Sequence, residues 1–244
     1  MFIPLYDNNP LVHVNRPYVN YALIAVNVVV YALTGGFGEE FLQHAAFSLG
    51  LVPSVVNDFK ELPPEYILIP ENASYVSYAF LHSDLLHLGG NMLFLWVFGD
   101  NIEDAAGHVK YLVFYLLCAA GAGFAHTLVD PYSDVPLIGA SGAIAGIVGA
   151  YLMLHPRVRV WVLILGRIPV PISAAIILGL WIAYQVYNFV NSYFVVSHVS
   201  WSAHIGGFLI GALLITVFRR RGVPLFDRGL AVANAEPPGQ DIRQ

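Results

Sequence analysis

Two residues that could act as a nucleophile and its base lie at the beginnings of two apolar segments. Ser141 stands in Gly139-Ala140-Ser141-Gly142 ahead of one segment, and His204 lies near the start of another. A histidine, with a reference pKa of about 6.5, can take the serine proton at neutral pH and return it to a leaving amine. Polar groups are costly at membrane depth, so such a set predicts a functional site. The pair suggests hydrolysis carried out inside a bilayer.

A second pair of polar residues could stabilise the oxyanion that this chemistry produces. His87 and Asn91 are four residues apart in an apolar segment, so their side chains share one helix face. Their N–H groups, with the backbone N–H of Ser141, could form the preorganised donors that an oxyanion needs. No Asp or Glu lies in 138–154 or 202–218, which predicts a Ser–His dyad without a third member.

The composition is that of an integral membrane protein. The chain is 57% hydrophobic and 11% charged, with a mean hydropathy of +0.66, whereas soluble domains carry about 25% charged residues. The net charge of −5 says little, because the distribution of the charges matters more. One cysteine, Cys118, excludes an intrachain disulfide. Residues 1–10 lack a basic region followed by an apolar core, so no cleavable signal peptide is expected.

Six segments could cross a membrane, which takes about 20 mostly apolar residues. They predict an all-α polytopic bundle with helices at 18–33, 85–102, 110–129, 138–154, 171–189 and 202–218. The fifth could begin at Val158, but Pro171 suits the first turn of a helix. We therefore expect an N-terminal segment at 1–17, a six-helix domain at 18–219 and a polar, disordered tail at 220–244.

One long connection separates the first two helices. Residues 35–83 contain four prolines and are too polar to span, yet they include apolar clusters such as 41–51. That mixture predicts an interfacial loop that lies on the membrane surface.

The basic residues set the orientation, because they concentrate on the cytoplasmic side of membrane proteins. With both termini cytoplasmic, only Lys60 lies outside, and all other basic residues lie inside: Arg16, Lys110, Arg157, Arg159, Arg167, Arg219, Arg220, Arg221, Arg228 and Arg243. The second, fourth and sixth helices then run inward from the outer face. His87, Ser141 and His204 begin them at similar depth, which direct contact requires.

Small residues explain how these helices could approach one another. Gly142 and Gly146 mark one face of the fourth helix, and Ala203, Gly207 and Gly211 mark one face of the sixth. Small-xxx-small patterns let helix backbones come close in lipid. A hydrogen bond from serine to histidine needs that closeness.

The sequence resembles the rhomboid intramembrane serine proteases of the bacterial six-helix type over roughly 18–218. The matching pieces occur in the family's order and are His82-x4-His87-x3-Asn91, Gly139-Ala140-Ser141-Gly142 and Ala203-His204-x2-Gly207-x3-Gly211. The resemblance implies that Ser141 is the nucleophile and His204 the base. It also implies that His87 and Asn91 help to form the oxyanion hole. Supporting roles fall to His82, Gly139, Gly142 and Gly207.

The same resemblance implies the setting in which the protein works. Its substrates would be transmembrane proteins, cut in or beside their membrane segments near the outer face. It implies no cofactor, metal ion or nucleic acid, and the compact six-span form favours a bacterial inner membrane. The oligomeric state stays open.

Two departures from the family separate this chain from many bacterial members. The first loop has no Trp-Arg pair. Some members carry a tyrosine one turn after the serine, where it stacks on the histidine, and Ala145 stands there instead. Another residue must therefore orient His204.

Three alternatives were weighed against proteolysis. A non-catalytic rhomboid-like escort protein would have lost the serine or the histidine, and this chain has both. A small transporter would place polar residues at the bilayer midplane, usually within inverted repeats. A metal site from His82, His87, His126 and His204 would leave Asn91 and Ser141 unexplained.

Overall fold

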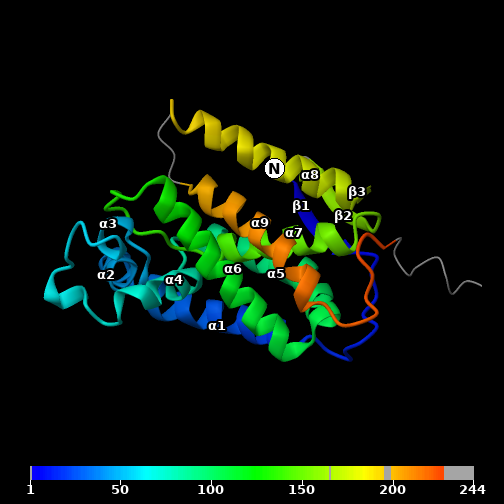
Figure 1. Ribbon diagram of the computed structural model, residues 1–244, viewed down its shortest axis with the longest axis horizontal. Coiled ribbons are helices and arrows are strands. Elements are labelled where there is room, and N and C mark those ends of the chain that lie inside the picture. Colours follow the sequence, from blue (N-terminus) through cyan, green and yellow to red (C-terminus); the bar gives the residue numbers. More distant parts are fainter. Residues whose placement is uncertain (1, 165, 195–198, 228–244) are drawn as a thin grey trace, which may run out of the picture.

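The six predicted membrane segments coincide with six long helices. The computed structural model describes residues 2–164, 166–194 and 199–227. Its long helices pack together in a bundle (Figure 1). They are α1 Tyr18–Thr34, α5 Leu85–Ala106, α6 His108–Val129, α7 Ser141–Leu154, α8 Ala174–Asn191 and α9 Trp201–Phe218. Each predicted segment overlaps one of them, so the polytopic helical architecture is confirmed.

Length and hydropathy agree with membrane spanning for three of the six long helices. Among the described residues, α6, α8 and α9 are long and apolar enough to cross a membrane, while α1 and α7 are shorter apolar helices. The sixth helix, α5, is 22 residues long and carries its acidic side chains at Asp100, Glu103 and Asp104, near its C-terminal end. Asp104 accepts backbone N–H groups of residues 12–14, and Glu103 accepts those of Val19 and Asn20. These carboxylates therefore tie the start of the chain to the end of α5.

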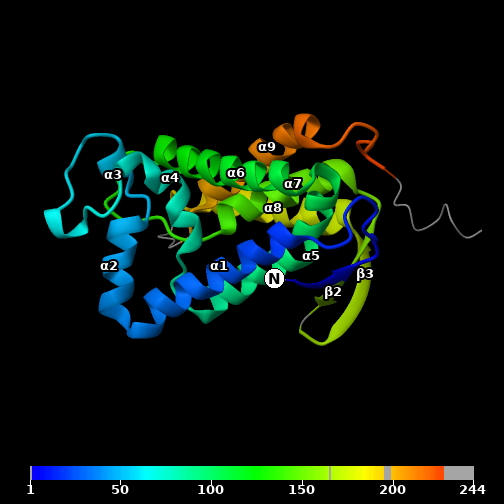
Figure 2. The ribbon, with the colours of Figure 1, turned by 90° about the horizontal axis from the view of Figure 1, so that it is seen from below.

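Helix α7 lies at the centre of the bundle between α6 and α9 (Figures 1 and 2). Every residue from Gly142 to Tyr151 is buried. A Cβ atom on Gly207 of α9 would lie 2.0 Å from the Gly142 carbonyl oxygen, and one on Gly211 would lie 2.0 Å from the Gly146 carbonyl oxygen. The two small-residue stripes therefore face each other, and the backbones of α7 and α9 are in direct contact.

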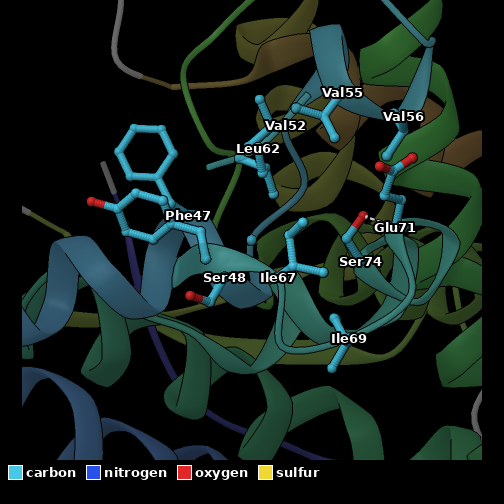
Figure 3. Close-up of a pocket in the computed structure, with 12 residues that line it drawn as sticks. Phe47, Ser48, Val52, Val55, Val56, Leu62, Ile67, Ile69, Glu71 and Ser74 are labelled. Carbon is cyan, nitrogen blue, oxygen red and sulfur yellow. Dashed lines mark hydrogen bonds between the residues drawn. The ribbon is translucent and has the colours of Figure 1, made fainter. Parts of the chain in front are cut away.

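The long connection between α1 and α5 forms one end of the molecule, which we call the loop end. It contains α2 Glu39–Leu49, α3 Pro53–Val56 and α4 Ser74–Ser77, with 3-10 turns at Gly35–Phe37, Pro64–Tyr66, Glu71–Ala73 and Tyr78–Phe80. These elements close around a small, mostly apolar pocket (Figure 3). Phe41, Phe59, Ile67 and Leu68 remain exposed, as a loop that lies on a membrane surface would leave them.

The opposite end, which we call the sheet end, holds a feature that the sequence did not predict. Strands β1 Ile3–Asp7, β2 Arg159–Ile164 and β3 Ile168–Ser173 form an antiparallel sheet in the order β1-β2-β3 (Figure 2). In β2, the side chains of Val160 and Val162 are buried and the residues on either side of each are less buried, which is the period-two pattern of a half-buried strand. Residues 159–173 therefore form a hairpin rather than an early start of α8. The predicted helix start at Pro171 was wrong, because Pro171 lies in the edge strand β3 opposite Trp161, where a proline is tolerated, and α8 begins at Ala174.

The structure also differs from the predicted tail at its beginning. Residues 220–227 are held by the bundle: the Arg220 N–H donates to the Ala105 carbonyl of α5 at 2.7 Å, and the N–H groups of Phe226 and Asp227 donate to the Met153 and Leu154 carbonyls at the end of α7 at 2.8 and 2.9 Å. The Asp227 carboxylate lies 2.7 Å from Nδ1 of His155. The remainder of the predicted disordered tail, residues 228–244, lies outside the described residues.

Candidate active site

Ser141 is the first residue of α7, at the loop end of the bundle. The chain enters α7 through Gly139, whose φ of +122° is a conformation that favours glycine. The Gly139 N–H donates to the Tyr78 carbonyl at 2.9 Å. A Cβ atom on Gly139 would lie 2.6 Å from Nε2 of His87. Gly139 is thus required by its backbone conformation and by the close approach of the histidine ring.

His204 lies in the first turn of α9, directly opposite Ser141. Its Nε2 atom is 2.8 Å from the Ser141 Oγ atom, which is a hydrogen-bond distance. The start of α9 is held by Ser200, whose hydroxyl accepts the Ala203 N–H and lies 2.8 Å from Nδ1 of His126. The structure therefore brings together the two residues that the sequence paired, and His126 supports the helix start.

Gly142 and Gly207 lie beside this pair and set the spacing between the two helices. Gly142 follows Ser141, and Gly207 lies one turn after His204. Their contact, in which Gly207 packs on the Gly142 carbonyl, occurs next to the serine–histidine hydrogen bond. The small residues thus hold the two polar side chains within reach.

Gln185 of α8 is a site residue that the sequence reasoning missed. Its Oε1 atom is 2.9 Å from Nδ1 of His204, and Gln185 is only 4% exposed. Trp181 stacks on the His204 ring with 6.2 Å between centroids, and Trp201 meets the ring edge-on at 6.0 Å. The sequence signal was an amide inside an apolar segment, since polar groups at membrane depth are costly, but Asn188 and Asn191 in the same helix carry the same signal.

These contacts answer the question that Ala145 raised. Ala145 is fully buried in α7 and offers no ring to the histidine. The orienting groups come instead from α8, through Gln185 and Trp181, and from the preceding turn of α9, through Trp201.

His87 is positioned by the residues that cap α5. Asp84 accepts the N–H groups of Leu86 and His87 at 2.9 and 2.8 Å and so caps the helix. These hydrogen bonds, of which the one from the His87 N–H has the largest effect, hold the pKa of Asp84 below its usual value. Ser83 Oγ lies 3.0 Å from the His87 Nδ1 atom, which fixes the ring while Nε2 faces Gly139.

Asn91 follows His87 by four residues on the same face of α5. It is 8% exposed, and its Nδ2 donor is buried with no hydrogen-bond partner among the described residues. A buried donor without a partner is costly. This one is available to an acceptor that arrives from outside the protein.

His82 is fully buried beside this cluster and meets the His87 ring edge-on at 5.0 Å. Neither of its ring nitrogens has a hydrogen-bond partner among the described residues. Burial, and then the neighbouring His87, lower the pKa of His82 to about 4. The ring is therefore neutral at physiological pH and packs against His87.

The arrangement places a serine hydroxyl, a histidine ring within hydrogen-bond distance of it and an unpaired amide donor at one end of three neighbouring helices. Across the described part of the chain, no group of three His, Cys, Asp or Glu side chains is placed to hold a metal ion. The four histidines weighed above as metal ligands therefore do not form such a group. The geometry suits acyl transfer through a serine.

Comparisons with known proteins cover the same part of the chain. A family model described as the Rhomboid domain matches residues 71–221, more than half of the chain. These residues include every one of the site residues discussed above.

Three relatives extend this similarity to mitochondrial and bacterial proteins. Rhomboid protein 1, mitochondrial, of Saccharomyces cerevisiae is 27% identical over 219 residues, covering 86% of this chain and 58% of the relative. Rhomboid protease GluP of Bacillus subtilis is 34% identical over 134 residues, covering 55% and 24%. Rhomboid protease GlpG of Yersinia pseudotuberculosis is 29% identical over 142 residues, covering 57% and 46%. The chain spans about half the length, or less, of these curated relatives.

Proposed function

The chain belongs to the rhomboid family, and we propose that it is a serine endopeptidase that hydrolyses peptide bonds in or next to transmembrane segments of other membrane proteins. The observation that carries this proposal is the 2.8 Å contact between Ser141 Oγ and His204 Nε2 at the starts of α7 and α9. Two relatives that bear the name rhomboid protease support it.

The proposed reaction proceeds through an acyl-enzyme. The Ser141 hydroxyl attacks the substrate carbonyl carbon while His204 Nε2 accepts its proton. The C–N bond then breaks, and the imidazolium returns the proton to the leaving amine. A water molecule, deprotonated by the same nitrogen, hydrolyses the ester and releases the second product and the free serine.

The oxyanion formed in both steps requires donors in place before the reaction. We assign this role to Asn91 Nδ2, His87 and the backbone N–H of Ser141. The unpaired state of the buried Asn91 amide supports the assignment, because the oxyanion would supply the acceptor that the amide lacks. The first N–H groups of a helix such as α7 also have no intrahelical acceptor.

The protein is an integral membrane protein, and we propose that its loop end faces outward. The basic residues support this orientation, since Arg159 and Arg167 belong to the hairpin at the sheet end and Lys60 lies in the loop end. Both termini would be cytoplasmic, and water would reach the serine from the outer face. The relatives are mitochondrial and bacterial, so they support a membrane location without favouring one of these membranes.

Labelling with a fluorophosphonate serine probe in detergent tests the nucleophile. We expect the parent protein to be labelled and the Ser141→Ala variant not to be. Ser173→Ala is the matched control, because Ser173 also stands at a helix start but its side chain makes no capping bond. This control should be labelled like the parent.

Cleavage of a reporter with a single transmembrane segment separates a protease from a client-binding protein. The parent should cut the reporter, and Ser141→Ala should bind it without cutting. Binding of the reporter by the parent without cleavage, together with no probe labelling, would contradict the proposal.

A further inference from the structure

Helix α8 meets the proposed site through a single buried polar residue. All of α8 is described, and its buried residues are Ala174, Ile177, Leu178 and Gln185. The first three lie in the half nearest the sheet end. Beyond Leu178, Gln185 alone is buried, while Leu180, Tyr184, Val186 and Tyr187 are exposed. The second half of α8, which lies at the edge of the bundle (Figure 1), is therefore buried only where it touches His204.

The proton positions at His204 follow from the two contacts of its ring. A neutral imidazole has one N–H and one lone pair. If Nε2 is to accept the Ser141 proton, the N–H must be on Nδ1, and it then needs an acceptor. The Oε1 atom of Gln185, 2.9 Å from Nδ1, is such an acceptor.

We propose that Gln185 is a positioning residue for His204, a neutral third member behind the serine–histidine pair. It holds the ring in the tautomer that leaves Nε2 free for Ser141. It also accepts a stronger hydrogen bond when the ring becomes an imidazolium during attack. This inference rests on the proposed function for its catalytic consequence, while the tautomer itself can be measured without activity.

The inference has a structural consequence for α8. Because the acceptor belongs to α8 and the histidine to α9, the Nδ1 hydrogen bond exists only while these two helices stay in contact at Gln185. Trp181, one turn earlier, stacks on the same ring and depends on the same contact.

Two substitutions at Gln185 separate hydrogen bonding from packing. Gln185→Met keeps the length of the side chain but removes the amide oxygen. We expect kcat to fall by about 10- to 100-fold, the loss of one hydrogen bond to a charged group, with KM changed less than about twofold. Gln185→Glu restores an oxygen acceptor in either protonation state, so its kcat should exceed that of Gln185→Met by at least about fivefold.

Asn188→Leu is the matched control, since it removes an amide one turn later in α8. Its Nδ2 donates to the Tyr184 carbonyl of the same helix, at 2.7 Å. Parent-like kcat is expected for this variant. Full activity of Gln185→Met would overturn the proposal. So would a Gln185→Glu variant that melts like the parent but is as inactive as Gln185→Met.

Nitrogen-15 NMR of the ring, recorded on the full chain in detergent, tests the tautomer directly. The His204 signals are assigned by their loss in His204→Ala. We expect Nδ1 to carry the proton in the parent, and the population of this tautomer to fall in Gln185→Met. A parent His204 with its proton on Nε2 would overturn the inference. A third outcome separates the two proposals. If the parent protein carries the proton on Nδ1 and Gln185→Met loses this tautomer, but the parent cleaves no substrate, the proposed function is refuted and the positioning role stands.

Discussion

Replacing Gly207 with alanine tests whether the contact between α7 and α9 builds the site. The added Cβ atom would lie 2.0 Å from the Gly142 carbonyl oxygen and 3.2 Å from the Ala122 Cβ atom. The first contact involves backbone, which cannot rotate away as the end of a flexible side chain would. Because packed interiors leave few voids, the two helices must separate locally by about 1 Å.

This separation is enough to break the proposed dyad. Ser141 precedes Gly142 and His204 lies one turn before Gly207, so the shift occurs at the level of the 2.8 Å hydrogen bond. An added separation of about 1 Å would take the Oγ–Nε2 distance beyond the range of a hydrogen bond, which ends near about 3.2 Å. We therefore expect Gly207→Ala to lose at least about 100-fold in kcat, because the serine no longer has its base.

Stability should change much less than activity. Overpacking costs about 1–3 kcal/mol, but alanine is favoured over glycine in a helix by about 1 kcal/mol. The net loss is therefore about 0–2 kcal/mol. Gly179→Ala in α8 is the control, because its Cβ atom would meet nothing within 4 Å. That variant should be fully active and at least as stable as the parent.

The assay is kcat on a transmembrane reporter, with thermal melting in detergent measured alongside. A Gly207→Ala protein with parent-like kcat would refute the reasoning, because it would show that the approach of α7 and α9 does not control the serine–histidine distance.

Three further predictions concern the proposed chemistry and the sheet end. Ser141→Ala and His204→Ala should each abolish cleavage, and the double variant should lose no more than either single variant, because the pair acts as a unit; additive losses would contradict this. Asn91→Ala should lower kcat by up to about 10²–10³ with little change in KM, whereas an effect on KM alone would indicate a role in substrate binding. Burial raises the pKa of Asp7 from 3.8 to about 6, so the folded protein favours the protonated carboxyl. The protonated carboxyl therefore contributes its full stabilisation below pH 3.8, and this stabilisation is lost as pH rises through about 6. Asp7→Asn should therefore raise stability at pH 7 by up to about 3 kcal/mol and flatten the dependence of the melting temperature on pH; an unchanged pH dependence would contradict this.

Much of the bundle could be predicted from the sequence, because the information is local. Each predicted helix is a mostly apolar run, and its ends are marked by polar residues, glycine or proline. The close approach of α7 and α9 followed in the same way, from glycines spaced four residues apart.

The proximity of Ser141 and His204 was also accessible, although 63 residues separate them. Helices that run in the same direction place residues near their starts at the same depth. The side-chain partner on Nδ1 was not accessible, because α8 carries three amides, Gln185, Asn188 and Asn191, and nothing local shows which of them faces His204.

The sheet end depended most on tertiary structure. The β1 strand pairs with β2 although 160 residues separate Ile3 from its partner Leu163, and Tyr151 of α7 donates to the Asp7 carboxylate of β1. The sequence determined which segments are helical and membrane-spanning, since burial in lipid acts on each segment separately. Only the tertiary structure decided the contacts of Gln185 with His204 and of Tyr151 with Asp7, because a hydrogen bond requires two side chains from distant segments to reach the same place at the correct distance.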